Sequence, residues 1–129
     1  MYLEYKGKKA ELEILKITNC ANLIGKWSGS PNKLIQGDNL PVLKTLLETY
    51  EMKGTVDLVY IDPPFSTGND FTIGNDRAST ISNSYLDDIA YSDNLIGSEF
   101  IEFLRERLIF LRELMSNKAS IYLHIDYKI

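Results

Sequence analysis

The sequence predicts an α/β domain with a parallel sheet, and three observations support this. The run VDLVYI at residues 56–61 is rich in β-branched and aromatic residues and is bounded by turn residues, which is typical of a strand buried on both faces. A short apolar run and a helical pattern precede it, and a second helical pattern and an apolar run follow it. Strands that alternate with helices indicate right-handed crossover units.

The first 31 residues are expected to form an N-terminal helical arm. Their apolar residues recur at helical spacing, which predicts a helix, or a helix followed by an irregular segment that ends near Gly29. The residues of this pattern are Leu12, Ile14, Leu15 and Ile17. Cys20 has apolar neighbours, so we expect it to be a small buried side chain rather than a nucleophile.

The chain becomes regular from residue 33 onward. The run KLIQ at residues 33–36 predicts a short strand, and the following GDN predicts a turn in which Asp38 or Asn39 caps a helix. Pro41 lies in the first turn of that helix, which we expect to continue to about Tyr50. Strand, helix and the run VDLVYI together predict the first crossover unit.

A long polar stretch separates this unit from the second helix. Residues 66–97 are rich in Ser, Asn, Asp and Gly without a sustained apolar period, so we expect a long mobile loop. From Glu99 apolar residues recur at helical spacing until Asn117. The run SIYLHID at residues 120–126 then predicts another core strand.

The composition indicates one ordinary globular domain. The 129 residues are 44% hydrophobic and 25% charged, and no run of about 18 apolar residues or signal-like N-terminus appears. We therefore expect a cytoplasmic location and no membrane partner. The net charge is −4, so the chain lacks the excess of basic residues that is typical of a strong DNA-binding module. Most of the affinity for any nucleic acid would have to come from elsewhere.

The stretch D-P-P-F at residues 62–65 predicts a binding site for an aromatic amine. In an open α/β sheet, ligands bind beyond the carboxyl ends of the strands, and Asp62 is the first residue past such an end. Pro63 and Pro64 lack backbone donors and stiffen the turn. The polar groups there are acceptors, and Phe65 adds an aromatic face. A nucleobase with an exocyclic amine would suit this arrangement.

A purely structural interpretation is also open. Asp-Pro turns commonly end strands, and Phe65 could pack back into the core. D-P-P alone supports both interpretations equally. The context of a strand, D-P-P-F and a long polar loop favours a site.

Three stretches of the chain carry a resemblance to a known family. VDLVYIDPPFSTGNDF resembles the catalytic motif of the amino-methyltransferases that modify adenine or cytosine in DNA. NKLIQGDNLPVLKTLL resembles the segment before that motif in the modification subunits of type III restriction systems, and ASIYLHIDYK is similar to the next core strand. The resemblance implies that residues 32–129 are the N-terminal portion of a Rossmann-like methyltransferase domain. The glycine-rich cofactor motif and the target recognition domain are not found in this chain, so we expect a truncated domain.

The resemblance also implies roles for individual residues. A methyl group would pass from S-adenosylmethionine to the N6 amine of a flipped adenine. Asp62 and the Pro63 carbonyl would accept hydrogen bonds from this amine in the turn stiffened by Pro64, and Phe65 would stack on the base. An aspartate in the first position resembles the adenine modifiers, whereas cytosine modifiers more often have serine there.

For the cofactor, the resemblance implies binding by Asp38, Asn39 and Asp62. Asp38 would accept from the adenine amine of the cofactor, although helix capping explains this residue equally well. His124 and Asp126 follow the family pattern at the end of the last strand, but we expect His124 to be a structural residue. Ser66 replaces the Asn that usual type III sequences have, which affects the loop rather than the reaction. No metal ligands are predicted.

The resemblance further implies partners and leaves alternatives. Duplex DNA would bind through domains outside this chain, and a restriction subunit and a second copy of the protein are further candidate partners. We expect the isolated chain to be inactive. The alternatives are a non-catalytic remnant or interaction module of the same fold, and a segment of a methyltransferase that acts on cytosine N4, on RNA or on a small-molecule amine.

Overall fold

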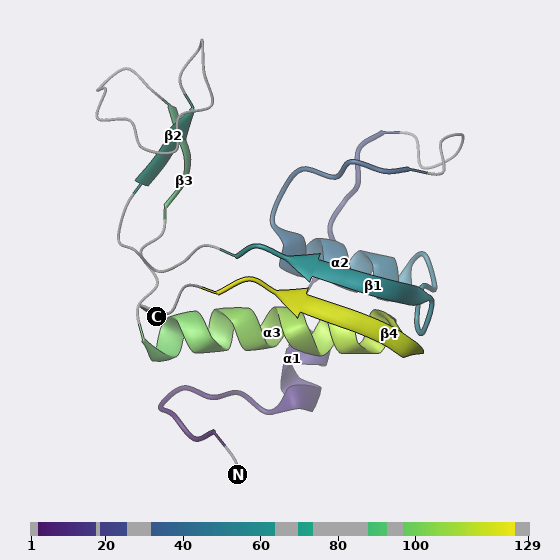
Figure 1. Cartoon of the computed structure of the whole chain (residues 1–129), viewed down its shortest axis with the longest axis horizontal. Coiled ribbons are helices and arrows are strands. Elements are labelled where there is room, and N and C mark those ends of the chain that lie inside the picture. Colours follow the sequence, from purple (N-terminus) through teal and green to yellow (C-terminus); the bar gives the residue numbers. More distant parts are fainter. Residues whose placement is uncertain are drawn as a thin grey trace.

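The computed structural model describes residues 3–17, 19–25, 32–63, 70–73, 88–92 and 97–125. Its helices are α1 (Glu11–Ile17), α2 (Asn39–Glu48) and α3 (Ser98–Leu114), and its strands are β1 (Val56–Ile61), β2 (Asp70–Ile73), β3 (Asp88–Ser92) and β4 (Met115–Leu123). In Figure 1, β1 and β4 lie side by side in front of the helices. Within the described residues no helix is long and apolar enough to cross a membrane.

The sheet formed by β1 and β4 confirms the predicted parallel pairing. Leu58 to Ile61 pair in register with Ser120 to Leu123, and the register shifts between Val56 and Leu58. The connection between the strands contains α3, as expected when two neighbouring strands run in the same direction. The backbone N–H groups of Gly54 and Thr55 donate to the last carbonyls of α3, so the start of β1 is tied to the end of this helix.

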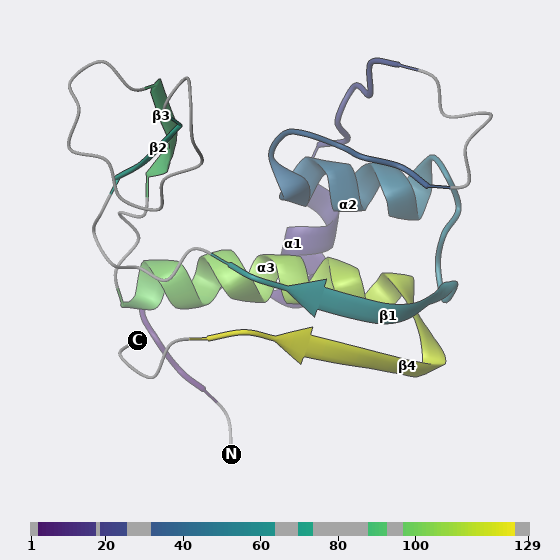
Figure 2. The same cartoon turned by 45° about the horizontal axis from the view of Figure 1, so that its top comes forward.

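Only one face of this sheet is covered in the described part of the chain. Figures 1 and 2 both place α2 and α3 on the same side of β1 and β4. Val59 is 7% exposed, whereas Leu58 is 62% and Tyr60 is 71% exposed. The prediction that β1 is buried on both faces is therefore wrong, because alternate side chains point to opposite faces and one of these faces has no covering layer.

The predicted strand at residues 33–36 is also wrong. These residues do not form a strand, and Leu34 is fully exposed. An extended segment becomes a strand only when its backbone groups pair with a neighbour, and both strand pairings in the described residues involve other segments. The crossover unit that forms is the one from β1 through α3 to β4.

The region predicted as one long loop contains a hairpin. β2 and β3 pair antiparallel, with Asp70 opposite Ser92 and Ile73 opposite Asp88, and the register shifts between Phe71 and Thr72. Figure 1 shows this hairpin beyond the carboxyl ends of β1 and β4. The expectation of a wholly irregular segment is thus wrong for these nine positions. The predicted mobility of the remaining loop residues lies outside the described residues.

The core lies where the three helices meet. Ile14 of α1 packs with Ile109 and Phe110 of α3, and Leu15, Leu40, Leu43 and Leu47 pack around them. The predicted apolar residues Leu43 and Leu47 of α2 lie in this cluster, but the α3 residues in it, Ile109 and Phe110, are not those whose spacing predicted that helix. The N-terminal segment contains the short helix α1, on which Ile14 is buried, whereas Leu12, a residue of the predicted apolar pattern, is 69% exposed.

Two buried polar side chains of α2 hold the arm in place. The Nζ of Lys44 donates to the carbonyl of Leu15 at 2.7 Å, near the C-terminal end of α1, where a cation is favourable. Thr45 Oγ1 accepts from the Ala21 amide at 2.8 Å. Cys20, next to this contact, is exposed, so the prediction of a buried thiol is wrong. Its Sγ lies 3.7 Å from Oε2 of Glu48 at the exposed end of α2, while Ala21 makes the contact with Thr45.

The segment before α1 is attached to α3 by carboxylates. Glu102 accepts from the hydroxyl of Tyr5 and, at 3.1 Å, from the amide of Lys9, and Glu106 pairs with the Lys9 ammonium at 2.5 Å. Desolvation alone would raise the pKa of Glu102, but the hydrogen bonds from Tyr5, Lys9 and Arg105 hold it below its ordinary value of 4.5. The ionised form of this carboxylate therefore stabilises the folded arm.

Replacement of Ile14 by alanine should destabilise the protein by about 2–5 kcal/mol, because it leaves a cavity between α1 and α3. The matched control is Leu12→Ala on the same helix, which should change the free energy of unfolding by less than about 0.5 kcal/mol. Urea unfolding of both variants measures this difference. Equal losses would show that α1 does not dock as described.

Glu102→Gln should destabilise the protein at neutral pH by about 1 kcal/mol, since it removes charge-assisted hydrogen bonds. The folded-state pKa of Glu102 is lowered, so its contribution is complete above pH 4.5 and is lost as the pH falls through the lowered value. Urea unfolding at neutral pH and at about pH 3 should therefore give a difference that shrinks in acid. The exposed Glu99→Gln is the control, and a pH-independent difference would contradict this assignment.

Candidate active site at the carboxyl edge of the sheet

Asp62 lies directly past the carboxyl end of β1, as predicted. The strand ends at Ile61, and the Asp62 side chain is 63% exposed. The following Pro63 is buried, so the start of the turn is held against the body of the protein while the carboxylate faces solvent. Pro64 and Phe65 lie outside the described residues, and the structure does not test their predicted roles.

His124 is the residue that the fold brings to Asp62. Its Nδ1 lies 3.4 Å from Oδ1 of Asp62, a contact that becomes an ion pair when the imidazole is protonated. The His124 amide donates to the Ile61 carbonyl at 2.9 Å and so continues the pairing of the two strands beyond the end of β4. Sequence reasoning placed His124 at a strand end but did not pair it with Asp62. The parallel register of β1 and β4 brings them together.

Asp38 is the N-cap of α2, so the capping role considered for it is confirmed. Its Oδ1 accepts from the Leu40 amide at 3.0 Å, and its backbone is extended, as is usual at this position. Asn39 is the first residue of the helix. In both views the N-terminal end of α2 points to the same edge as the carboxyl ends of β1 and β4 (Figures 1 and 2). In the described part of the chain no hydrogen bond or ion pair joins Asp38 to Asp62.

Arg107 of α3 contacts both residues of this turn, and sequence reasoning missed it. Nη2 donates to Oδ1 of Asp38 at 3.1 Å, and Nε donates to Oδ1 of Asn39 at 2.6 Å. Burial lowers the pKa of Arg107, while the negative charges of Asp38 and Glu106 oppose this effect. A signal was present in the sequence, because Arg107 occupies the helical face that otherwise carries the buried apolar residues of α3.

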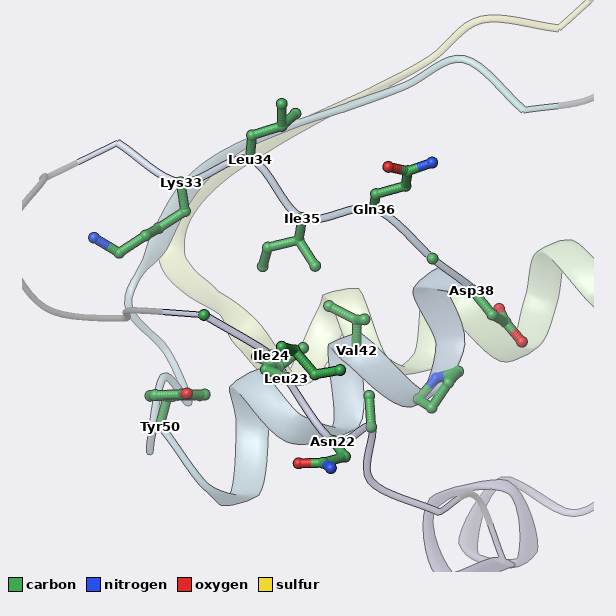
Figure 3. Close-up of a pocket in the computed structure, with 14 residues that line it drawn as sticks. Asn22, Leu23, Ile24, Lys33, Leu34, Ile35, Gln36, Asp38, Val42 and Tyr50 are labelled. Atoms are coloured by element: carbon green, nitrogen blue, oxygen red, sulfur yellow. The ribbon is translucent and has the colours of Figure 1, made fainter. Parts of the chain in front are cut away.

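A cavity of about 610 Å³ lies beside Asp38, between residues 21–25 and residues 33–38. Figure 3 shows Ile35 and Val42 facing one another across it, while the Asp38 carboxylate lies at its rim and is turned away from them. Asp62 and His124 do not line this cavity. The volume is in the range of ligand pockets, which are mostly apolar with a few polar groups.

The described residues contain no group of three or more His, Cys, Asp and Glu side chains that could hold a metal ion. The polar groups at this edge are the Asp62 carboxylate, the His124 imidazole and peptide carbonyls. Such a set can accept hydrogen bonds from an amine and orient it.

Comparison with known proteins shows which family the chain resembles. A family model described as DNA methylase, of the N6 and N4 type, matches residues 56–129. The chain is 35% identical to the type II methyltransferase M.EcaI of Enterobacter cloacae, over 98% of its own length and 26% of that relative. It is 34% identical to the EcoPI Mod subunit, a type III restriction-modification enzyme of Escherichia phage P1, over 75% of its own length and 17% of the relative.

The chain thus spans about a quarter or less of the length of these two relatives. No solved structure shows significant similarity to it. The family model covers β1, the Asp62 turn, α3 and β4, which are the elements that form the carboxyl edge described above. From the strand-end carboxylate, the parallel crossover and this match, we conclude that the chain belongs to the family of N6 and N4 DNA methylases.

Proposed function

We propose that this chain contributes the amine-binding half of an active site that methylates the N6 amine of adenine in DNA, in a methyltransferase of a restriction-modification system. The main support is the position of Asp62, an exposed carboxylate directly beyond the carboxyl end of β1 and next to His124, in a member of the DNA methylase family. The type II and type III names of the relatives support the biological setting.

The acceptors at the end of β1 suit an aromatic amine. The Asp62 carboxylate and the carbonyl of Pro63 can each accept one N–H of the amine, and neither Pro63 nor Pro64 has an N–H that competes for these acceptors. Two hydrogen bonds would fix the amine and direct its lone pair toward the reacting carbon. Orientation is the effect we assign to Asp62, because an aromatic amine is a weak nucleophile whose lone pair is delocalised.

His124 limits the positions that the Asp62 carboxylate can take. Its ring approaches Oδ1 from the neighbouring strand, so that oxygen is held on the side of β4. The backbone hydrogen bond from His124 to Ile61 keeps the carboxyl ends of the two strands next to each other. A carboxylate held in this way loses less conformational freedom when it binds an amine.

Phe65 follows the two prolines and would stack on the base. An adenine inside duplex DNA cannot reach this turn, so the base must be rotated out of the helix before it meets Asp62. Stacking on an aromatic ring is suited to hold such a base, because every base has an exposed π-face.

S-adenosylmethionine would supply the methyl group as an electrophilic carbon on sulfur. The residues available for it are Asp38 at the N-terminus of α2, together with Asn39 and Asp62. Oδ2 of Asp38 has no hydrogen bond within the described residues and the side chain is 62% exposed, so this oxygen can accept from the adenine amine of the cofactor. The cavity beside it has both polar and apolar lining, and Ile35 and Val42 offer apolar surface for a flat ring.

The partners of the whole protein follow from the same proposal. The net charge of −4 gives this chain little attraction for phosphates, so duplex DNA would bind mainly through other parts of the methyltransferase. A restriction subunit would be a further partner in a type III system, as the name of the phage relative suggests.

Asp62→Asn should lower methyl transfer to adenine at least about 100-fold, since the misoriented amine no longer directs its lone pair to the reacting carbon. The matched control is Asp57→Asn at the other end of β1, where the carboxylate accepts from Ser116 at 2.6 Å. Transfer of a labelled methyl group from S-adenosylmethionine to DNA, measured with the whole protein, compares the two variants.

Thermal unfolding of both variants serves as the folding control. If Asp62→Asn keeps most of its activity at unchanged stability, Asp62 only terminates a strand and the proposed site is wrong. If the unmodified protein methylates cytosine instead of adenine, the proposed substrate is wrong and the N4 amine of cytosine is the substrate.

Phe65→Ala should weaken binding of the flipped base by about 1–3 kcal/mol, the usual contribution of stacking a base on an aromatic side chain. Phe65→Tyr keeps the ring and should retain binding. Fluorescence of 2-aminopurine at the target position reports the flipped base, and total DNA binding is measured in parallel. A loss of all DNA binding in Phe65→Ala would indicate a different role for the ring.

A further inference from the structure

Arg107 is a buried cation in the middle of α3 whose donors all face the turn before α2 or its own helix. Nε donates to Asn39 Oδ1 at 2.6 Å, Nη2 donates to Asp38 Oδ1 at 3.1 Å, and Nη1 donates to the Phe103 carbonyl at 2.9 Å. The guanidinium carbon also lies 3.4 Å from the centre of the Phe103 ring. The guanidinium is thus held by hydrogen bonds at Nε, Nη1 and Nη2, and the Phe103 ring lies against one of its faces.

Stability alone does not account well for this arrangement. Taking a guanidinium out of water costs free energy that one ion pair often fails to recover, and apolar side chains of similar size frequently stabilise such positions equally well. Here the burial is also asymmetric, because the Arg107 side chain is 11% exposed while its partner Asp38 is 62% exposed. The buried group holds an exposed carboxylate in place.

The hydrogen bonds of Asp38 show which of its carboxylate oxygens Arg107 holds in place. Oδ1 accepts from both the Leu40 amide and Arg107, so the side chain is fixed by its helix and by α3 at the same oxygen. Oδ2 has no hydrogen-bond partner among the residues that the structure describes. In Figure 3 the Asp38 carboxylate lies clear of Ile35 and Val42, at the rim of the cavity. The outcome is one oriented acceptor at the N-terminal end of α2.

We propose that Arg107 is a positioning residue for cofactor binding, which acts by fixing the Asp38 carboxylate and the Asn39 amide so that Oδ2 of Asp38 is directed to an amine of the ligand. This inference rests on the proposed function, because it takes Asp38 as a residue that binds S-adenosylmethionine. It assigns the role to a residue in α3, 69 positions away along the chain from Asp38.

Arginine is suited to this task and lysine is not. The planar guanidinium presents donors in a rigid fork that can hold two acceptors on neighbouring residues at once, whereas an ammonium is a single point of charge on a flexible chain. Arg107→Lys therefore keeps the buried cation but loses one of the two contacts with the turn. Arg107→Met removes both contacts and keeps most of the apolar volume.

The test measures the dissociation constant of S-adenosylmethionine by calorimetry on the whole protein, without DNA. Arg107→Met should raise this constant about 10-fold, the size expected for coupled residues in contact. Arg107→Lys should give a smaller increase. The matched control is Arg105→Met on the same helix, which pairs with Glu102 at 3.1 Å and should leave the constant unchanged.

A double-mutant cycle separates positioning from a general structural role. In an Asp38→Asn background, Arg107→Met should raise the constant by less than about 2-fold, because the carboxylate that Arg107 positions is already gone. An equal increase in both backgrounds, or no increase in the Arg107 single variants, overturns the inference. If Arg107→Met unfolds, Arg107→Lys takes its place in the same cycle, with thermal unfolding as the control.

These outcomes differ from failure of the proposed function. If the unmodified protein does not bind S-adenosylmethionine, the proposed function fails and the inference fails with it. If the unmodified protein binds and Asp38→Asn weakens binding but the Arg107 variants do not, only the inference is wrong.

Discussion

The parallel pairing of β1 with β4 is the constraint on which the rest of the structure depends. Parallel strands cannot be joined by a tight turn, so the connection must travel back along the sheet, and α3 provides most of that return. The same pairing brings the carboxyl ends of both strands to one edge. Asp62 and His124 are far apart in the sequence, yet the register of Ile61 with Leu123 makes them neighbours.

The helices α2 and α3 connect this sheet to Asp38 and Asn39, the residues proposed to bind the cofactor. They cover one face of β1 and β4, and the N-terminal end of α2 points to the edge where Asp62 lies (Figure 2). Arg107 then joins α3 to the turn before α2 through Asp38 and Asn39. One helix face therefore carries both the apolar packing against Ile14 and the polar contact that orients the turn.

The other face of the sheet is apolar and uncovered in the described residues. Leu58, Tyr60 and Tyr122 are all exposed there, although a parallel strand normally has helices on both sides. The relatives are about four to six times as long as the part of them that this chain matches, as the aligned shares of 26% and 17% imply. The apolar composition of β1 is typical of a strand with both faces buried, but among the described residues only one of its faces is covered.

The sequence by itself determined one core strand, two helices and the position of Asp62 at a strand end. The β-branched run of β1, the helical periodicity of α2 and α3, and the position of Asp62 after Ile61 depend on residues close together in the chain, so local patterns were sufficient to predict them. The capping role of Asp38 was predictable for the same reason.

Only the tertiary structure decided which distant residues meet. Residues 33–36 have the pattern of a strand but do not pair, because pairing requires a neighbour that no local pattern specifies. The hairpin of β2 and β3 needs two segments with weak individual signals. The contacts of His124 with Asp62 and of Arg107 with Asp38 arise from strand register and helix packing, and these long-range arrangements are set by the fold as a whole.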